Sequence, residues 1–454
     1  MDALNSTVLQ ISDVIWNGLL LWLLVGTGVF YSIRTRFVQV RRFGASMKRA
    51  FGDLNLHGEK AGSEGMSSFQ ALATAIAAQV GTGNIAGCAT ALVSGGPGAI
   101  FWMWIAAFFG MATIFGEAVL AQRTKTRDAS GSVIGGPVYY IEKAFKGGFG
   151  KFLATFFAVA IILALGFMGN MVQSNSISAA FNSALDVPTW IVGVIVAAIA
   201  AFIFVGGIGR IASFTEKAVP LMAGLYILGC VVVLALNWQA LPGAFGSIFV
   251  CAFDPQAAGG AVAGITVRQA IRYGVARGLF SNEAGMGSTP HSHAIAKVDR
   301  PQDQGEVAMV GVFIDTFVVL TLTALVILSS GVLDSMIASG VTGVAVAQGA
   351  FDNTFGSFGN IFIAVCLFFF AFSTIIGWYF FGEQNIRWLF GNKMVKIYAA
   401  IVTVLIFVGS LLKVELVWNL ADLFNGLMVF PNLLALLALS GIVTKIAHDR
   451  DAKP

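Results

Sequence analysis

Charged residues are scarce in this sequence. Asp, Glu, Lys and Arg make up 11% of its 454 residues, whereas soluble globular domains contain about 25%. Apolar residues make up 57% of the chain, and the mean hydropathy is +0.83. This balance is typical of a protein embedded in a lipid bilayer. The apolar residues form long runs, which argues against a transmembrane β-barrel, because barrel strands alternate in polarity over about ten residues.

Cysteine and histidine are also rare, with four of each. The cysteines lie in or beside apolar runs without CxxC spacing, which predicts neither a disulfide framework nor a metal site. His291 and His293 stand outside any HExxH pattern, GxSxG is absent, and GTGNIAG at 81–87 lacks dinucleotide-binding spacing. Basic residues are not interleaved with exposed aromatics, as nucleic-acid binding would require. The sequence therefore predicts no enzyme, no organic cofactor and no nucleic-acid partner.

Apolar runs long enough to cross a bilayer, about 20 residues each, predict eleven helical spans. They lie near residues 13–32, 67–93, 98–122, 152–182, 188–207, 213–237, 262–297, 304–331, 358–387, 394–412 and 415–442. Basic residues gather in alternate connections, which predicts an outside N-terminus and a cytoplasmic C-terminus in a plasma (inner) membrane. The first 16 residues contain no Lys or Arg, so we expect the first run to be a retained span and not a signal peptide. Residues 33–60 are a basic segment, predicted to lie in the cytoplasmic interface with its cations near lipid headgroups.

The segment Gln79–Gly87 interrupts the second apolar run with glycine and asparagine. Both residue types disfavour a helix interior, although Gly83 and Gly87 would also suit close helix packing. A second interruption, GLFSNEAGMGSTP at 278–290, occurs about 200 residues later. Two glycine-interrupted spans favour a secondary transporter whose site lies where two broken helices meet.

The span count itself suggests a repeat. Five spans at 67–237 precede five at 262–442, and each set begins with an interrupted helix. Because five is odd, the second set enters from the opposite side, which makes the repeat inverted. The sequence thus predicts one transmembrane domain over 1–454, an all-α 5+5 inverted repeat preceded by an extra helix at 13–32.

A broken helix can bind ions at its exposed ends. Free N–H groups at 81–84 can hold a carboxylate, and free carbonyls at Ala77, Gln79 and Val80 can hold a hard cation, with the Asn84 oxygen as a further ligand. Together these groups suit a small zwitterion carried with Na⁺. Ser281 and Asn282, in the second interruption, are candidate acceptors for an ammonium group.

Ionisable groups inside apolar spans are candidates for coupling or gating. Glu283 must be protonated, paired or at a water-filled mouth, and Arg277 is a candidate partner in a structural or gating salt bridge. Asp315 is a second candidate, whereas Glu117 and Asp422 are interpreted as ties between helices. The arginines of the seventh span, at 268, 272 and 277, are predicted to face an aqueous vestibule.

Several long motifs resemble the alanine or glycine:cation symporter family, the sodium-coupled small amino-acid carriers of prokaryotes. They are QVGTGNIAG (79–87), GGPGAIFWMW (95–104), FGMAT (109–113), GGP (135–137) and SNEAGMGSTP (281–290). The resemblance spans essentially the whole chain and implies the leucine-transporter fold. In that fold the second, seventh and ninth spans here correspond to the first, sixth and eighth core helices.

The resemblance also implies roles for single residues. The backbone at 80–83, with Thr82, would bind the substrate carboxylate, and Gln173 stands where related carriers use Tyr. Phe280 and Met286 would limit the pocket to alanine or glycine by their bulk. A sodium site would be formed by the carbonyls of Ala77 and Val80 and the hydroxyls of Ser373 and Thr374, and Gln79 with Asn84 would serve a second cation site.

The predicted function is therefore sodium-coupled import of alanine or glycine by alternating access. A proton-coupled carrier that titrates Asp315 or Glu283 is an alternative within the same class. A channel or a membrane-embedded receptor is an alternative from another class, and it would need a continuous polar stripe along several helices. The sequence instead shows polar clusters at mid-depth.

Overall fold

The computed structural model describes residues 2–52, 65–128, 131–412 and 415–448. The first half contains α1 (Asp2–Val14), α2 (Leu21–Arg34), α3 (Val38–Arg41), α4 (Phe43–Gly52), α5 (Ser68–Gln79), α6 (Cys88–Gly95), α7 (Gly98–Thr124), α8 (Pro137–Ala144), α9 (Gly147–Ile161), α10 (Asn170–Leu185), α11 (Thr189–Val205) and α12 (Gly207–Leu236). The second half contains α13 (Leu241–Val250), α14 (Val267–Asn282), α15 (Pro290–Ala294), α16 (Pro301–Val312), α17 (Thr321–Ser329), α18 (Leu333–Ala338), α19 (Val344–Phe355), α20 (Ser357–Phe390), α21 (Val395–Leu411), α22 (Glu415–Ala438) and α23 (Ser440–His448).

Shorter elements link these helices. Wider π-helical turns are η1 (Ile15–Leu20), η2 (Gly83–Gly87), η3 (Ile162–Gly169) and η7 (Phe313–Leu320), and 3₁₀ turns are η4 (Trp238–Ala240), η5 (Pro255–Ala258), η6 (Gly260–Gly264) and η8 (Asn392–Met394). Two two-residue strand pairs complete the structure. Strand β1 (Met66–Ser67) pairs in parallel with β4 (Ala296–Lys297), and β2 (Thr126–Arg127) pairs antiparallel with β3 (Val133–Ile134).

The prediction of an all-α membrane protein is confirmed. Within the described residues, eight helices are long and apolar enough to cross a membrane, and the bent pair α5 and α6 makes a ninth. Two further predicted spans correspond to α11, which has only 17 residues, and to α14, which carries three arginines. The total of eleven spans and the inverted repeat stay predictions.

Both interruptions of the apolar runs are breaks in the structure. The axes of α5 and of Gly83–Gly95 differ by 48°. The second break is longer than a kink, because α14 ends at Asn282 and the next helix, α15, has only five residues. Gly285 and Gly287 both have positive φ, at 86° and 81°, which stops the helix from continuing. The second interruption is therefore a break, as the sequence predicts, and a membrane crossing by 262–297 stays a prediction.

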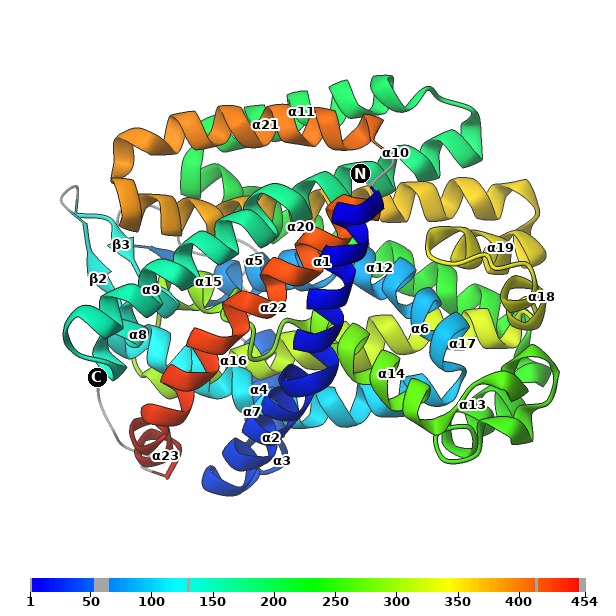
Figure 1. Ribbon diagram of the computed structural model, residues 1–454, viewed down its shortest axis with the longest axis horizontal. Helices are drawn as coiled ribbons and strands as arrows, with labels where there is room; N and C mark the ends of the chain where they lie inside the picture. Colours follow the sequence, from blue (N-terminus) through cyan, green and yellow to red (C-terminus); the bar gives the residue numbers. More distant parts are fainter. Residues whose placement is uncertain (1, 53–64, 129–130, 413–414, 449–454) are drawn as a thin grey trace.

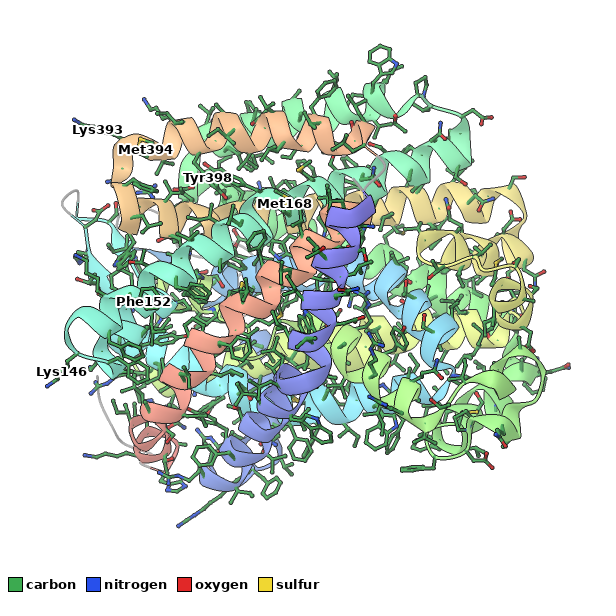
Figure 2. All side chains as sticks on the ribbon, in the orientation of Figure 1. Lys146, Phe152, Met168, Lys393, Met394 and Tyr398 are labelled. Carbon is green, nitrogen blue, oxygen red and sulfur yellow. The ribbon has the colours of Figure 1, made fainter. Side chains whose placement is uncertain are left out.

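The helices form a layered bundle in which α1 and α22 cross one face, while α11 and α21 lie side by side along one edge (Figure 1). Apolar side chains cover much of the outer surface, and Phe152 on α9 is 63% exposed (Figure 2). Lys146 and Lys393 lie at one end of the bundle (Figure 2), whereas α13, α18 and α19, from connections without basic residues, lie at the other (Figure 1). The basic and the non-basic connections thus lie at opposite ends, and the orientation in the membrane stays a prediction.

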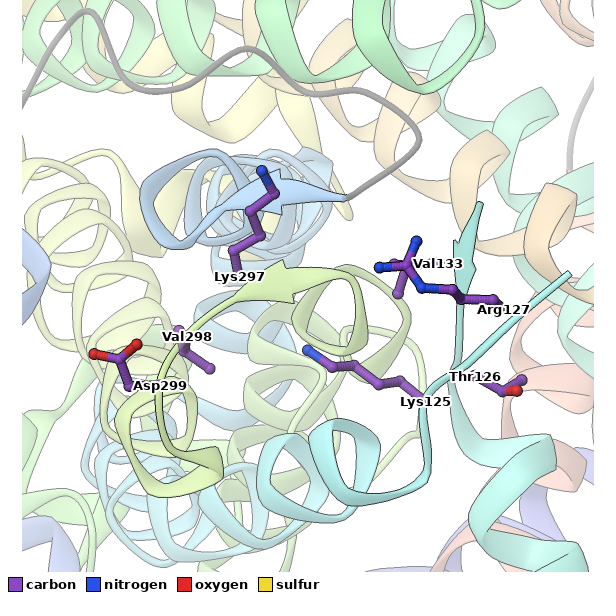
Figure 3. Close-up of a pocket in the computed structure, with 7 residues that line it drawn as sticks. All are labelled: Lys125, Thr126, Arg127, Val133, Lys297, Val298 and Asp299. Carbon is purple, nitrogen blue, oxygen red and sulfur yellow. The ribbon is translucent and has the colours of Figure 1, made fainter. Parts of the chain in front are cut away.

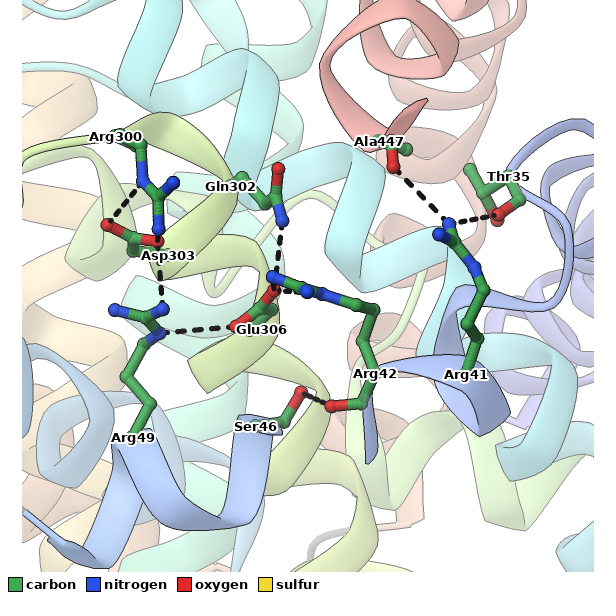
Figure 4. Close-up of polar contacts among 10 residues, drawn as sticks. All are labelled: Thr35, Arg41, Arg42, Ser46, Arg49, Arg300, Gln302, Asp303, Glu306 and Ala447. Atoms are coloured by element: carbon green, nitrogen blue, oxygen red, sulfur yellow. Dashed lines mark hydrogen bonds and ion pairs between the residues drawn. The ribbon is translucent and has the colours of Figure 1, made fainter. Parts of the chain in front are cut away.

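The basic segment after α2 turns part of its charge inward, toward α16 (Figure 4). Arg42 and Arg49 form ion pairs with Glu306 at 2.6 and 3.2 Å, and Arg49 also reaches Asp303 at 3.2 Å. Buried carboxylates of α16 therefore bind both guanidinium groups, and contact of the segment with lipid headgroups stays a prediction. Residues 53–60 of the predicted segment lie outside the described residues.

Candidate functional site

The first break frees a backbone carbonyl at the end of α5. In a continuous helix the N–H of Gly81 would donate to the carbonyl of Ala77, four residues earlier. Here it donates to Asn84 Oδ1 at 3.0 Å, because the chain leaves the helix at Val80 (φ −82°, ψ 88°). The Ala77 carbonyl is consequently available to groups outside its own helix.

Two hydroxyls from α20 lie against that carbonyl. Thr374 Oγ1 is 3.0 Å from Ala77 O, and Ser373 Oγ is 3.3 Å from it. The same oxygens lie 3.0 and 2.9 Å from the carbonyl of Phe370 in α20. A hydroxyl has one proton to donate. Each of these hydroxyls lies near two carbonyl oxygens, so one of its two oxygen contacts is not a hydrogen bond. The arrangement is a cluster of oxygens suited to a small hard cation.

Three of the four predicted ligands of the first sodium site are thus in mutual contact. The fourth, Val80, is buried at the end of α5, next to Gly81. Gly81 itself is pressed against α20, since a Cβ there would lie 2.3 Å from Thr374 Oγ1. The close approach of these two helices depends on glycine at this position.

Asp315, on η7, connects both breaks. Its carboxylate accepts hydrogen bonds from Asn84 Nδ2 at 2.7 Å, Ser281 Oγ at 3.0 Å and Thr316 Oγ1 at 2.8 Å. All these side chains are buried. Asp315 therefore joins η2 to the end of α14, a role that its isolated position in the sequence does not reveal.

The predicted second cation site is only partly assembled. Asn84 uses its amide nitrogen on Asp315 and its oxygen on the Gly81 N–H. Gln79 donates to the carbonyl of Asn282 at 2.7 Å, and its buried Oε1 has no partner among the described residues. Gln79 and Asn84 thus make separate contacts, and a cation between them stays a prediction.

The predicted pairing of Glu283 with Arg277 is wrong. Glu283 accepts from Trp378 Nε1 at 2.6 Å and from Ser288 Oγ at 2.5 Å, whereas Arg277 lies 3.7 Å from Asp422. Six helical positions correspond to a rotation of about 240°, and Glu283 adopts a left-handed conformation (φ 58°) just past the helix. Both factors point the two side chains in different directions.

Glu117 and Asp422 tie helices together, as interpreted from the sequence. Glu117 accepts from the backbone N–H groups of Gly285 and Gly287, both at 3.0 Å, and from Asn432 at 2.7 Å. Asp422 joins α22 to α14 through Arg277. Glu117 thus supplies the acceptors that the non-helical backbone after α14 needs inside a membrane.

A cavity of about 370 Å³ lies on the side of α14 toward α1 and α22. Its charged lining comprises Asp13, Arg272, Arg277 and Asp422, and Phe280 also lines it. Arg272 pairs with Asp13 at 2.6 Å. Two of the three arginines predicted to face a vestibule therefore line this cavity. Arg268 lines a second hollow with Trp22 and Trp102, and Arg272 lines both.

The remaining predicted substrate residues do not all lie at one place in the structure. Gly83 lies against Ser281, since its Cβ would be 3.2 Å from the Ser281 Cα. Thr82 Oγ1 and Gln173 Oε1 are buried without partners among the described residues, so both retain hydrogen-bonding capacity. Met286 lies in the turn between the two glycines bound by Glu117.

Sequence reasoning missed two contributors, Trp378 and Asn432. Trp378 binds Glu283, and Asn432 donates to Glu117. Trp378 follows Thr374 by four residues in one helix, which places it on the same face one turn further along. That spacing is the signal that would have found it, whereas Asn432 has no comparable signal.

Comparison with known proteins identifies the family of this chain. Residues 1–453 match the model of the sodium:alanine symporter family. A sodium/alanine symporter of Methanococcus maripaludis, AgcS, is 43% identical over 439 residues, covering 96% of this chain and 95% of that protein. A probable sodium/glutamine symporter of Bacillus subtilis, GlnT, is 41% identical over 440 residues, covering 96% of this chain and 89% of that protein.

A solved structure supports the predicted fold. The crystal structure of MhsT in complex with L-phenylalanine matches with a TM-score of 0.59 at 15% identity, covering 86% of this chain and 98% of that chain. The fold is therefore of the leucine-transporter type, as the resemblance implied. With a family model that matches nearly every residue and relatives above 40% identity, the chain belongs to the sodium:alanine symporter family.

Proposed function

We propose that this protein imports a small neutral amino acid, alanine or glycine, together with Na⁺. The observation that carries the proposal is the oxygen cluster between α5 and α20. The freed Ala77 carbonyl, the two α20 hydroxyls and the close approach at Gly81 suit a desolvated Na⁺ ion. A cation bound there would hold the two helices together.

The substrate would bind beside this cation, at the break itself. The backbone at 80–83 leaves its regular helix, and N–H groups at a helix start favour a carboxylate. Thr82 has a buried hydroxyl without a described partner, which supports a role in that contact. Phe280, on the last turn of α14, would limit the size of the side chain.

The relatives support transport of neutral amino acids, although they differ in cargo. One is named for alanine and another for glutamine, so family membership alone leaves the substrate open. The bulk of Phe280, on the last turn of α14, is the feature that favours alanine or glycine here. We further propose an outside N-terminus and a cytoplasmic C-terminus, because the basic connections gather at one end of the bundle.

Coupling between Na⁺ and substrate follows from the thermodynamic linkage of the two binding equilibria. If Na⁺ orders the break, sodium raises the affinity for substrate, and substrate raises the affinity for sodium by the same factor. One cation that moves through a potential of about 100 mV releases about 2.3 kcal/mol, which corresponds to roughly 50-fold accumulation. Access would alternate by rocking of one helix bundle about the buried site.

The double variant Ser373→Ala/Thr374→Ala tests this proposal. Loss of both hydroxyls should raise the sodium concentration for half-maximal alanine uptake about tenfold, equivalent to about 1.4 kcal/mol of binding free energy. Uptake would be measured in proteoliposomes with sodium or potassium outside. Thr403→Ala is the matched control, because its hydroxyl donates to Ala399 of its own helix at 2.8 Å.

An unchanged sodium requirement in the double variant would contradict the site. Uptake that continues without sodium and stops when a pH gradient is removed would contradict sodium coupling itself. In that case Asp315, which contacts both breaks, would be the first group to examine as a proton carrier. Saturable counterflow would argue against a channel.

A further inference from the structure

An apolar hollow of about 940 Å³ lies between α2, α7 and α14. Its walls include Val25 of α2, Ile105 of α7, and Ile271 and Val275 of α14. No acidic side chain is among the described residues that line it. Transfer of hydrocarbon from water to such a surface is favourable, so these walls suit an apolar chain better than a polar solute.

The other end of α7 carries a hollow of a different kind, with a volume of about 620 Å³. Lys125, Arg127, Lys297 and Asp299 line it (Figure 3). Lys125 Nζ donates to Gln122 Oε1 at 2.7 Å, and the Asp299 carboxylate adds a negative charge to the same lining. Its polar groups are thus already engaged with one another, whereas the apolar hollow offers a hydrocarbon surface.

The apolar hollow opens where α2 and α7 diverge. Farther along, these two helices pack closely, because a Cβ on Gly28 of α2 would lie 2.9 Å from Phe109 of α7. Just before α2 the chain contacts α22 instead, since Trp16 Nε1 donates to the carbonyl of Asp422 at 2.9 Å. The space between the starts of α2 and α7 therefore results from the packing of the helices themselves.

One side of the hollow is closed by α14, and the other is open. A Cβ on Gly274 of α14 would lie 2.4 Å from the carbonyl oxygen of Ala99, so α14 packs directly on α7. On the open side Trp22 is 75% exposed, and Trp102 Nε1 donates to the carbonyl of Ala252 at 3.1 Å. Tryptophan is enriched at the membrane–water interface. We therefore place the mouth of the hollow where acyl chains meet headgroups.

The two arginines of this lining differ in their partners. Arg272 pairs with Asp13 at 2.6 Å and lies over the Tyr273 ring at 5.3 Å, so its charge is already compensated. Arg268 lies about one turn nearer the start of α14. It is exposed and makes no hydrogen bond or ion pair within the described part of the chain. A cation at membrane depth normally has a partner or reaches water, so Arg268 is available to an external anion.

We propose that the hollow binds a phospholipid of the surrounding bilayer that has an anionic headgroup. An acyl chain would lie along the apolar walls, and the phosphate would meet the guanidinium of Arg268, whose planar fork matches two phosphate oxygens. From Arg268 to Val275, α14 rises about 10 Å, less than one leaflet of a hydrocarbon core about 30 Å thick. One lipid in its own leaflet can therefore make both contacts.

The net charge of the headgroup decides between common phospholipids. Phosphatidylglycerol and phosphatidylcholine share the phosphate, but choline adds a positive charge beside Arg268 and Arg272. Like charges repel, so the anionic lipid should bind more tightly. Because α14 ends at the second break, a lipid bound here would contact a helix that borders the proposed site.

The test measures binding and not uptake, so its failure would leave the proposed function untouched. The purified full chain in non-ionic detergent would be titrated with phosphatidylglycerol or phosphatidylcholine of equal chain length, and bound lipid followed by native mass spectrometry and thermal shift. We expect saturable binding of phosphatidylglycerol, at least fivefold tighter than that of phosphatidylcholine. Arg268→Gln should abolish this preference, and Val25→Trp, which fills the hollow, should weaken binding of both lipids at least tenfold.

Two variants serve as matched controls. Arg123→Gln removes an exposed arginine at the opposite end of α7. Leu228→Trp adds bulk on the outer face of α12, where Leu228 is 63% exposed. Both variants should bind the two lipids as the wild type does. Glycerophosphoglycerol, which has the headgroup without the chains, should not compete at the same concentrations.

The proposal is overturned by equal affinities for the two phospholipids, or by equal losses in Arg268→Gln and Arg123→Gln. Unchanged lipid binding by Val25→Trp, or tight binding of glycerophosphoglycerol, would show that the apolar walls play no part. If Val25→Trp fails to fold, Arg268→Gln still decides the question, because it changes only an exposed side chain.

Discussion

Alanine at Gly81 is expected to reduce sodium-dependent uptake by about 100-fold. The backbone at Gly81 permits alanine, because its φ lies outside the left-handed region. The alanine side chain would clash with α20, since the new Cβ would lie 2.3 Å from Thr374 Oγ1. Overpacking costs about 1–3 kcal/mol, and here the displaced atom is a proposed sodium ligand. That cost, expressed as sodium affinity, corresponds to about 5- to 150-fold.

Gly87→Ala provides the matched control for this experiment. It lies in the same broken helix, but the nearest atom to its Cβ would be the Thr82 carbonyl oxygen at 4.0 Å. Uptake by this variant should stay within about twofold of wild type. Thermal stability measured in detergent would separate a folding defect from a transport defect. Normal sodium-dependent uptake by Gly81→Ala would show that the contact with Thr374 does not shape the site.

The second large effect is expected from Glu306→Ala, at the inward-facing ion-pair cluster of α4 and α16. Glu306 is fully buried and accepts from Arg42 Nε at 2.7 Å, Arg49 Nε at 3.2 Å and Gln302 Nε2 at 3.1 Å (Figure 4). Its removal would leave the Arg42 guanidinium without its carboxylate partner, and Arg49 would keep only its ion pair with Asp303. Loss of one partner of a fully buried ion pair costs about 3–5 kcal/mol, and we expect the lower end of that range because the two arginine side chains are 22% and 32% exposed.

The measurement is the free energy of unfolding, or the midpoint temperature, of the purified protein in detergent. Glu142→Ala is the control, because it removes a carboxylate from a partly exposed position and should change stability by less than about 0.5 kcal/mol. If the two variants are equally stable, α4 is not anchored through Glu306. The double variant Arg42→Ala/Glu306→Ala should lose less than the sum of its parts, since contacting residues couple.

The sequence by itself determined the class of protein and the position of its breaks. Hydropathy is a local property, so runs of apolar residues identify helices without knowledge of their neighbours. Glycine and asparagine disfavour a helix wherever they stand, which is why the break at Gly81 was predictable. The contact between Ala77 and the α20 hydroxyls came from the resemblance, because its residues lie about 300 positions apart.

Only the tertiary structure decided which charged groups meet. Arg277 pairs with Asp422 and not with Glu283, and Arg42 pairs with the buried Glu306. The sequence could not show these pairings, because long side chains reach partners on whichever helix packs beside them. Asp315 is the clearest case. Its sequence position gives an isolated carboxylate in an apolar helix, and only the packing of η7 against η2 and α14 makes it the junction of both breaks.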